Sequence, residues 1–337
     1  MSRVKGQLKR RSPKPRARGP KPRNHGPKPK AESLKPSIGI IGLGIMGSAM
    51  ATNLVRARYR VVGYDVDAAR VRQHVRSGGI AGRAAGDVGK RSDVVICSLP
   101  SAAALAQVAQ ELARSGGVEI VVETSTLPIA SKEAARQQLA ASGITLLDCP
   151  LSGTGSQAKV RDIVVYASGS RAAYEHVAPV MNAFARGHYY VGPFGAGSKT
   201  KFVANLLVAI HNVAAAEALV LAMKAGLDPA TTLKVVADGG GSSRMLQVRG
   251  PMMVRGSYSE PTMKLDVWQK DMTAIADFAR EVGCPTPLFA TTAPIYLAAM
   301  AAGRGAEDTG AVCAVLEEMA GVERPPASRK RKRNREG

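Results

Sequence analysis

Residues 37–65 limit the fold of this chain more than any other stretch, because they place a glycine-rich turn between two strand patterns. They read SIGIIGLGIMGSAMATNLVRARYRVVGYD. The β-branched run 38–41 is typical of a buried parallel strand, residues 48–58 of a helix and residues 60–64 of a second strand. The glycines have the spacing G-x-G-x-x-G, and Asp65 follows about 20 residues later, which together predict a dinucleotide site.

Each part of this stretch has a physical task in binding a dinucleotide. Gly42 permits the tight turn out of the strand, Gly44 lets the backbone approach a pyrophosphate, and Gly47 lets helix and strand pack closely. The helix N-terminus offers amide hydrogens to the phosphates, and Asp65 can bind the ribose hydroxyls while it repels a 2′-phosphate. The alternative is a glycine-rich turn in an unrelated α/β domain. The predicted cofactor loop consists of Gly42, Leu43, Gly44, Ile45, Met46 and Gly47.

The net charge of +21 is concentrated at the two ends of the chain. Residues 1–36 contain thirteen Lys or Arg and one acidic residue, and residues 324–337 contain seven and one. These segments have almost nothing apolar to bury, so we expect two disordered basic tails. We favour solvated extensions; the alternative is electrostatic contact between the tails and nucleic acid. The nearly balanced charge of the residues between them is typical of a soluble enzyme.

Signals for secretion, membrane insertion and metal binding are weak in this sequence. The N-terminus lacks the apolar core of a secretory signal. The most apolar long segment, residues 202–223, contains Asn205, His211, Asn212 and Glu217, which favours a buried helix over a membrane span. The four cysteines are far apart, with no C-x-x-C and no histidine cluster, which is typical of a reduced cytoplasmic protein without a bound metal.

Strand and helix patterns alternate through residues 37–197, the predicted cofactor-binding domain. Further strands are predicted at 92–99, 119–123, 144–148 and 162–168, with helices at 68–77, 102–113 and 129–141. Such repeats predict an α/β fold of Rossmann type, with a doubly wound parallel sheet. Ligands bind these sheets beyond the carboxyl ends of the strands, so we expect the site at the loops after Leu99, Glu123 and Asp148.

Residues 198–323 have helical patterns instead. The first segment, 198–225, is apolar almost all round, so we expect one long buried helix between the two domains. Further helices are predicted at about 229–237, 243–255, 265–282, 288–302 and 307–320. We expect this all-α domain to contribute substrate and dimerisation contacts, in a homodimer or a homotetramer.

Lys201 and Asn205 lie four residues apart at the start of the long helix and therefore share one face. A lysine in this setting can exchange a proton with a hydroxyl or carbonyl oxygen while the amide orients that group. Partial burial would lower the pKa of the lysine towards working pH. The alternative is a surface lysine beside an incidental asparagine.

Four motifs, taken together and in order, resemble the β-hydroxyacid dehydrogenase family. They are GLGIMG at 42–47, DCPLSGTGSQA at 148–158, GAGSKTKFVANLL at 195–207 and WQKD at 268–271. Ser125 and Thr126, followed by Pro128, fit a further loop of the family. The resemblance covers about residues 37–322, and the stretches 206–222 and 287–312 look most like the L-threonate dehydrogenase branch.

The resemblance implies an NAD(P)-dependent oxidoreductase that transfers hydride between a nicotinamide and a small hydroxyacid, without a metal. The implied substrate is similar to L-threonate, 3-hydroxyisobutyrate or 2-hydroxy-3-oxopropionate. Lys201 is implied as the general acid/base and Asn205 as the residue that orients the substrate. The other implied site residues are Ser152, Gly153 and Thr154 for the substrate carboxylate, and Leu99, Pro100, Ser125, Thr126 and Lys270 for the cofactor. Thr154 stands where the family has a second glycine, and Ala204 where it often has asparagine.

Three alternatives remain open at this stage. Arg244, after the glycine run 239–241, can pair with a substrate acid or phosphate, or can be a solvent-exposed arginine. Asp65 favours NAD over NADP, whereas Arg70 nearby leaves NADP open. A function of another class is a catalytically weak binding protein that uses its basic tails on nucleic acid, against which the retained Lys201 argues. Imine reduction is disfavoured, because it requires another residue in place of the lysine.

Overall fold

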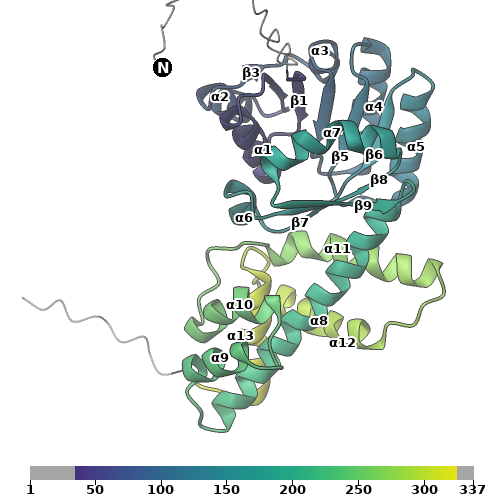
Figure 1. Ribbon diagram of the computed structural model, residues 1–337. Helices are drawn as coiled ribbons and strands as arrows, with labels where there is room; N and C mark the ends of the chain where they lie inside the picture. The colour runs from purple at the N-terminus through teal and green to yellow at the C-terminus, as the bar shows by residue number, and fades with distance from the viewer. Residues whose placement is uncertain (1–34, 325–337) are drawn as a thin grey trace, which may run out of the picture. The chain divides into compact units, whose positions relative to one another are not determined.

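The computed structural model describes residues 35–324 (Figure 1). The predicted disorder of the tails and their contact with nucleic acid fall almost wholly outside this range. Three residues assigned to the tails are described, namely Lys35, Pro36 and Arg324. Lys35 places its ammonium 4.9 Å from the centre of the Tyr59 ring, and the Arg324 guanidinium forms an ion pair with Glu317.

The first half of the described chain is built on a nine-stranded sheet (Figure 1). Six strands are parallel and lie in the order β3-β2-β1-β4-β5-β6, and β8, which pairs with β6 and β7, runs antiparallel to both. The strands are β1 (Ile38–Ile41), β2 (Val61–Tyr64), β3 (Ile80–Ala81), β4 (Val94–Cys97), β5 (Ile120–Glu123), β6 (Thr145–Asp148), β7 (Leu151–Ser152), β8 (Val164–Ser168) and β9 (Gly187–Gly192).

Helices cover both faces of this sheet, so the predicted doubly wound fold is confirmed. Ile38 and Ile40 of β1 join an apolar cluster that includes Met50 and Phe184, whereas Ile41 faces a second cluster that includes Leu105. The β-branched run of β1 is thus buried on both sides, as parallel strands are. The helices are α1 (Ile45–Arg56), α2 (Ala68–Arg76), α3 (Ala85–Lys90), α4 (Ala102–Ser115), α5 (Ile129–Ala140), α6 (Gly155–Lys159) and α7 (Arg171–Phe184).

The structure adds elements that the alternation of patterns does not predict. These are β3, α3, β7, α6, α7 and β9, most of them short. The antiparallel direction of β8 is also absent from the prediction, because the apolar pattern of a strand does not depend on the direction in which the strand runs.

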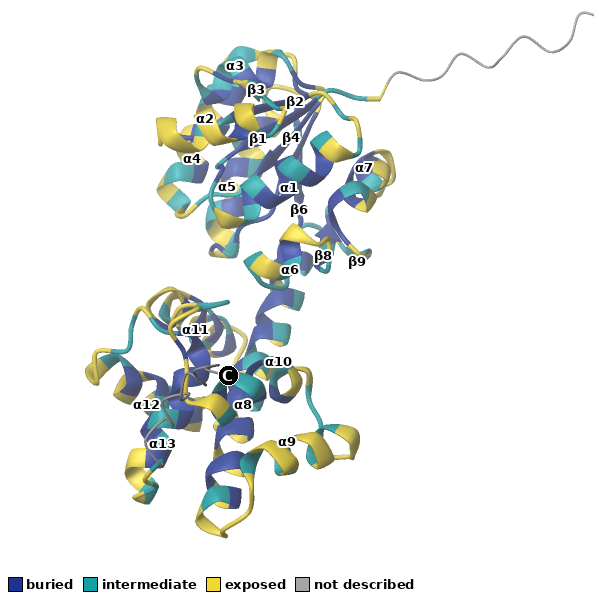
Figure 2. Ribbon diagram, turned by 90° about the vertical axis from the view of Figure 1, so that its left-hand side faces the viewer, coloured by how far each residue is buried: buried dark blue, intermediate teal, exposed yellow. Residues whose placement is uncertain are grey.

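The second half is helical and is organised around the 29-residue helix α8 (Ala196–Lys224). Figure 2 shows buried residues along α8 where it runs from the sheet into the other helices. The predicted domain division at residue 197 falls in its first turn and stays a prediction. The remaining elements are α9 (Pro229–Asp238), α10 (Arg244–Arg255), α11 (Leu265–Glu281), α12 (Pro287–Ala301), the 3-10 helix η1 (Thr309–Ala311) and α13 (Val312–Ala320).

Helix α8 is long and apolar enough to cross a membrane by length and composition alone. Its polar side chains, however, are used inside the helical domain. The buried Asn212 amide donates to the Tyr296 hydroxyl at 3.1 Å and to the Thr309 carbonyl oxygen at 2.8 Å. These contacts support the prediction of a core helix, since buried amides need hydrogen-bond partners.

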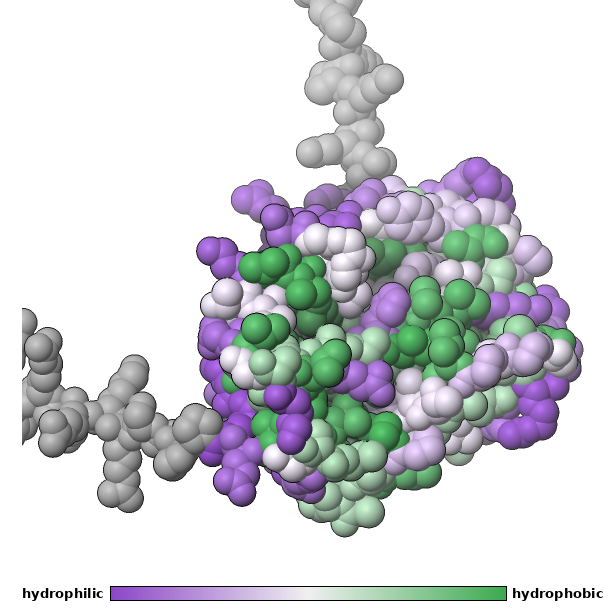
Figure 3. Space-filling view, turned by 90° about the horizontal axis from the view of Figure 1, so that it is seen from below, coloured by the Kyte–Doolittle hydropathy of each residue, from purple (hydrophilic) through white to green (hydrophobic). Residues whose placement is uncertain are grey.

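The surface of the helical domain carries exposed apolar side chains. Figure 3 shows such side chains on the face seen from below, next to hydrophilic ones. The exposed large apolar residues of α8 and α12 include Leu207, Leu221, Leu288 and Leu297.

Candidate active site

The glycine-rich turn between β1 and α1 has the geometry that a dinucleotide requires. Gly42 has φ of +89°, and a Cβ there would collide with the Ser98 carbonyl oxygen. A Cβ on Gly47 would collide with the carbonyl oxygen of Gly42. At Gly44, by contrast, the nearest atom lies 3.9 Å from the position of a Cβ, which leaves room for a phosphate to approach. These residues therefore fit a dinucleotide.

Asp65 lies at the end of β2, where it holds the turn in place. Its Oδ2 accepts a hydrogen bond from the Leu43 N–H at 2.7 Å, and its Oδ1 accepts from the Asp67 N–H at 2.9 Å. The half-exposed Arg70 guanidinium is 3.4 Å from the same Oδ2. The Asp65 carboxylate and the Arg70 guanidinium are thus neighbours at the end of β2, where the ribose of a dinucleotide binds in folds of this type.

A first cavity of about 310 Å³ extends from the cofactor loop to the helical domain. The predicted residues that line it are Ile45, Met46, Leu99, Ser125, Thr126, Gly153, Thr154 and Lys201. Pro100 and Lys270 are exposed and do not line this cavity, whereas Lys264 and Asp271 do. Most of the residues predicted for the nicotinamide side of the site are therefore brought together.

A second cavity of about 180 Å³ adjoins the first. All the residues predicted for catalysis and substrate binding line it: Ser152, Gly153, Thr154, Lys201, Asn205 and Arg244. Lys201 lines both cavities. A reactant in the second cavity and a cofactor in the first would therefore meet beside the Lys201 ammonium.

Lys201 is buried, with 9% of its surface exposed, on the second turn of α8. Burial lowers the pKa of Lys201, and the nearby Asp271 carboxylate opposes part of this effect. Burial raises the pKa of Asp271, while the charges of Lys201 and Lys270 act in the other direction. Because burial disfavours the charged form, the lysine can release its proton more readily than a solvated lysine can.

Asn205 shares this environment, because its Nδ2 donates to Asp271 Oδ2 at 3.0 Å. The sequence argument missed Asp271. A signal was present, since Asp271 directly follows Lys270 in the WQKD motif, but the motif alone does not tell which of its charged residues faces inward.

The Thr154 side chain forms hydrogen bonds within its own segment of the chain. Its hydroxyl accepts from the Gln157 N–H at 3.4 Å, and the Gln157 side chain accepts from the Thr154 N–H at 3.0 Å. Thr154 therefore caps the short helix α6 and lines both cavities.

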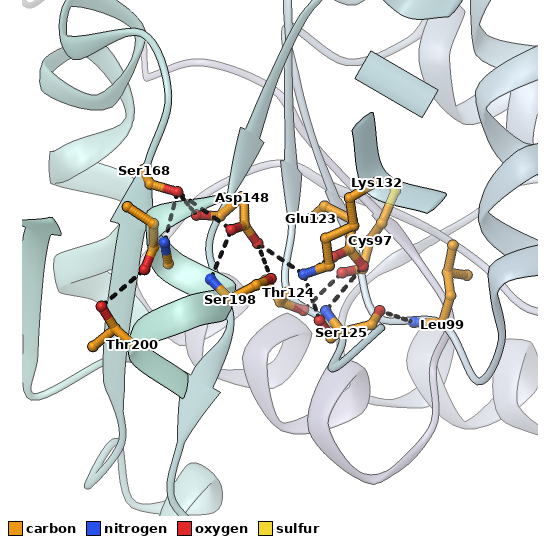
Figure 4. A network of polar contacts seen from close by, with 12 residues as sticks. Cys97, Leu99, Glu123, Thr124, Ser125, Lys132, Asp148, Ser168, Ser198 and Thr200 are labelled. Atoms are coloured by element: carbon orange, nitrogen blue, oxygen red, sulfur yellow. Dashed lines mark hydrogen bonds and ion pairs between the residues drawn. The ribbon is translucent and has the colours of Figure 1, made fainter. Parts of the chain in front are cut away.

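A buried ion network joins Lys132 to Glu123 and Asp148 (Figure 4). The Lys132 ammonium, with no exposed surface, is 2.6 Å from Glu123 Oε2 and 2.8 Å from Asp148 Oδ1, and it donates to the Ser125 carbonyl oxygen at 2.7 Å. Burial alone would lower the pKa of Lys132, but the two carboxylates outweigh it and raise that pKa. Lys132 is therefore a fully charged group enclosed by its partners.

The network connects the cofactor side of the site to the helix that carries Lys201 (Figure 4). On one side, the Ser125 hydroxyl accepts from the Leu99 N–H at 2.7 Å. On the other side, Asp148 accepts hydrogen bonds from the Ser198 N–H and hydroxyl, both at 2.8 Å. The N-cap of α8 is Gly195, which has no side chain, so Asp148 supplies the capping carboxylate from β6.

Two family models match consecutive parts of the chain. Residues 37–192 match the NAD binding domain of 6-phosphogluconate dehydrogenase. Residues 195–316 match the model described as NAD-binding of NADP-dependent 3-hydroxyisobutyrate dehydrogenase.

Individual relatives align over almost their whole length. An L-threonate dehydrogenase of Cupriavidus necator is 33% identical over 294 residues, which cover 86% of this chain and 98% of the relative. A 2-(hydroxymethyl)glutarate dehydrogenase of Eubacterium barkeri is 31% identical, over 85% of this chain and 96% of the relative. The crystal structure of a 3-hydroxyisobutyrate dehydrogenase from Salmonella typhimurium is 32% identical, with a TM-score of 0.74 over 83% of this chain and 99% of that one.

Proposed function

The chain belongs to the β-hydroxyacid dehydrogenase family, and on that premise we propose that it oxidises a short hydroxyacid of the L-threonate type with NAD. It is an NAD(P)-dependent oxidoreductase, as its relatives are. The observation that carries the proposal is the position of Lys201, which is buried and lines both cavities. The alternative of a weakly catalytic binding protein is not supported by these relatives.

Each residue of the proposed site has one task. In the oxidation direction, neutral Lys201 accepts the hydroxyl proton of the substrate, and in the reduction direction its ammonium returns that proton to the carbonyl oxygen. Asn205, held by Asp271, orients the substrate oxygen. Ser152 and Gly153 bind the substrate carboxylate at the wall of the second cavity. The nicotinamide, when bound against the first cavity, supplies the hydride acceptor or donor.

Burial lowers the pKa of Lys201, and the Asp271 charge limits this fall. In Asp271→Asn the new side chain keeps an oxygen for Asn205 but loses the charge that opposes the effect of burial on Lys201. The pKa of Lys201 therefore falls further, and the acid limb of kcat/KM for oxidation moves to lower pH. The check is a pH–rate profile of both proteins; a limb that moves to higher pH would contradict this assignment.

We propose NAD as the preferred cofactor because the Asp65 carboxylate stands where a 2′-phosphate would bind. In Asp65→Ser this negative charge is gone while Arg70 remains. The ratio of kcat/KM for NADP to that for NAD should rise by about tenfold or more, as expected for a charged contact. The control is Asp67→Ser; an unchanged ratio in Asp65→Ser would argue against a ribose contact.

A panel of hydroxyacids tests the function itself. Formation of NADH from NAD, or of NADPH from NADP, is followed with L-threonate, D-glycerate, 3-hydroxyisobutyrate, 4-hydroxybutyrate and 2-(hydroxymethyl)glutarate. We expect turnover of at least one acid by the wild type. If no acid is oxidised although the protein binds NAD, the proposed oxidation of short hydroxyacids of this type is contradicted.

Two further features belong to this proposal. We infer a homodimer or homotetramer from the exposed leucines of α8 and α12, because apolar side chains gathered at a surface mark protein contacts. Light scattering at several concentrations measures the oligomeric state directly.

We also infer a cytoplasmic location, in keeping with the reduced cysteines Cys97, Cys149, Cys284 and Cys313.

A further inference from the structure

The second cavity contains more positive than negative charge. Among the described residues, its charged lining consists of Lys201, Arg186, Arg244, Arg249 and Asp162. Two of the four cations have partners outside this lining. The Asp271 carboxylate interacts electrostatically with Lys201, and Nε of the buried Arg249 lies 3.0 Å from Asp308 Oδ1. Arg186 and Arg244 are left to share the single carboxylate of Asp162.

Asp162 is already occupied by other donors. Its Oδ1 accepts from Arg186 Nε at 2.8 Å, and its Oδ2 accepts from Gln157 Nε2 at 3.0 Å. Arg244 Nη2 lies 3.6 Å from Oδ2, beyond hydrogen-bond distance. The cavity therefore has one more guanidinium group than it has carboxylates to pair with. The N–H donors of the planar Arg244 guanidinium are available to a ligand.

Helix stability does not account for Arg244. It is the first residue of α10, whose N-cap is Ser243, and a cation at a helix N-terminus is electrostatically unfavourable. The side chain is 65% exposed, so it reaches the cavity from its open side. A cation in this position is explained if a negatively charged group binds there.

We propose that the substrate carries a second anionic group, a carboxylate or a phosphate, and that Arg244 binds this distal group while Ser152 and Gly153 bind the first carboxylate. This inference rests on the proposed function and narrows its substrate class from L-threonate itself to a short hydroxyacid of that type with a second anion. The cavity of about 180 Å³ is smaller than the roughly 300–1,000 Å³ of drug-sized sites, which suits a short acid. Arg244 is then the specificity-determining residue that distinguishes dianionic from monoanionic hydroxyacids.

Matched substrate pairs test this selectivity. 2-(Hydroxymethyl)glutarate and 3-hydroxyisobutyrate share a hydroxymethyl group beside a carboxylate and differ in the tail, and L-threonate 4-phosphate and L-threonate differ in the phosphate. We expect kcat/KM to favour the dianion of at least one pair by about tenfold, the size of one accessible charge-assisted contact. The pair with the larger ratio tells whether the distal group is a carboxylate or a phosphate.

Variants assign the selectivity to Arg244. In Arg244→Gln the ratio of dianion to monoanion kcat/KM should fall close to one, and Arg244→Lys should retain part of it, because lysine keeps the charge without the fork. Asp162→Asn should increase the ratio, because it removes the competing carboxylate. Arg255→Gln, an exposed arginine at the other end of α10, is the matched control and should leave the ratio unchanged.

A binding experiment separates this inference from the proposed function. Glutarate and butyrate lack the hydroxyl group, so calorimetric titration of the NAD-loaded enzyme reports distal-anion binding without chemistry. We expect glutarate to bind about tenfold more tightly than butyrate to the wild type and equally to Arg244→Gln. Equal binding to the wild type, with no dianion preference in turnover, would overturn the inference. Selective binding without turnover of any hydroxyacid would overturn only the proposed function.

Discussion

Lys201→Met should lower kcat for hydroxyacid oxidation by about a thousandfold, the middle of the range for loss of a general acid/base. Methionine has a similar length and suits the buried position, so the fold and the cavities should persist. The lost group is the amine that we propose as the acceptor of the hydroxyl proton, and it lines both cavities. The measurement is steady-state NADH formation, with NAD affinity determined on the same preparation.

Lys199→Met provides the matched control for this prediction. Lys199 lies two residues earlier on α8 but is exposed, so its removal should change kcat less than twofold, as surface substitutions away from a site do. If Lys201→Met kept most of its kcat, the proton would have to be transferred by another group. A loss of NAD affinity in Lys201→Met would instead indicate a damaged fold.

Lys132→Met should destabilise the protein by about 3–5 kcal/mol, the usual cost of removing one partner of a buried ion pair. The substitution leaves the carboxylates of Glu123 and Asp148 without their cation in a fully buried position. It also removes the hydrogen bond to the Ser125 carbonyl oxygen. The free energy of unfolding from urea titrations measures this effect.

A second variant shows whether the unpaired charges cause the loss. Lys132→Met combined with Glu123→Gln and Asp148→Asn removes all three charges and should recover part of the lost stability, because no buried charge is then unpaired. Arg136→Met, on the same helix but partly exposed, should cost less than about 1 kcal/mol. A Lys132→Met protein as stable as the wild type would contradict the buried ion network.

Local patterns in the sequence predicted the glycine-rich cofactor loop and the helix that carries Lys201 and Asn205. The G-x-G-x-x-G turn and the Lys201–Asn205 pair each lie within a few residues of one another, so their geometry follows from one strand, turn or helix. The spacing of residues within one motif does not predict which motifs meet in space. The first cavity shows this, because Ser125, Gly153 and Lys201 come from three separate segments and line it together.

The residues that the sequence argument missed act over long distances in the chain. Asp271 meets Asn205 across 66 residues, and its inward direction depends on how α11 packs against α8. Lys132 reads as an ordinary polar residue of an amphipathic helix, and only the fold shows that it is enclosed between β5 and β6. The role of Lys270 was inferred from a motif, and it stays a prediction, with the side chain exposed beside Asp271.

The pH dependence of kcat/KM for hydroxyacid oxidation by the wild type and by Lys201→Met tests the central claim most directly. The wild-type profile should rise with pH and level off below the ordinary pKa of a lysine, because burial lowers the pKa of Lys201. The variant should lose this limb together with most of its activity. The account would be contradicted if the Lys201→Met profile kept the same limb at a comparable rate.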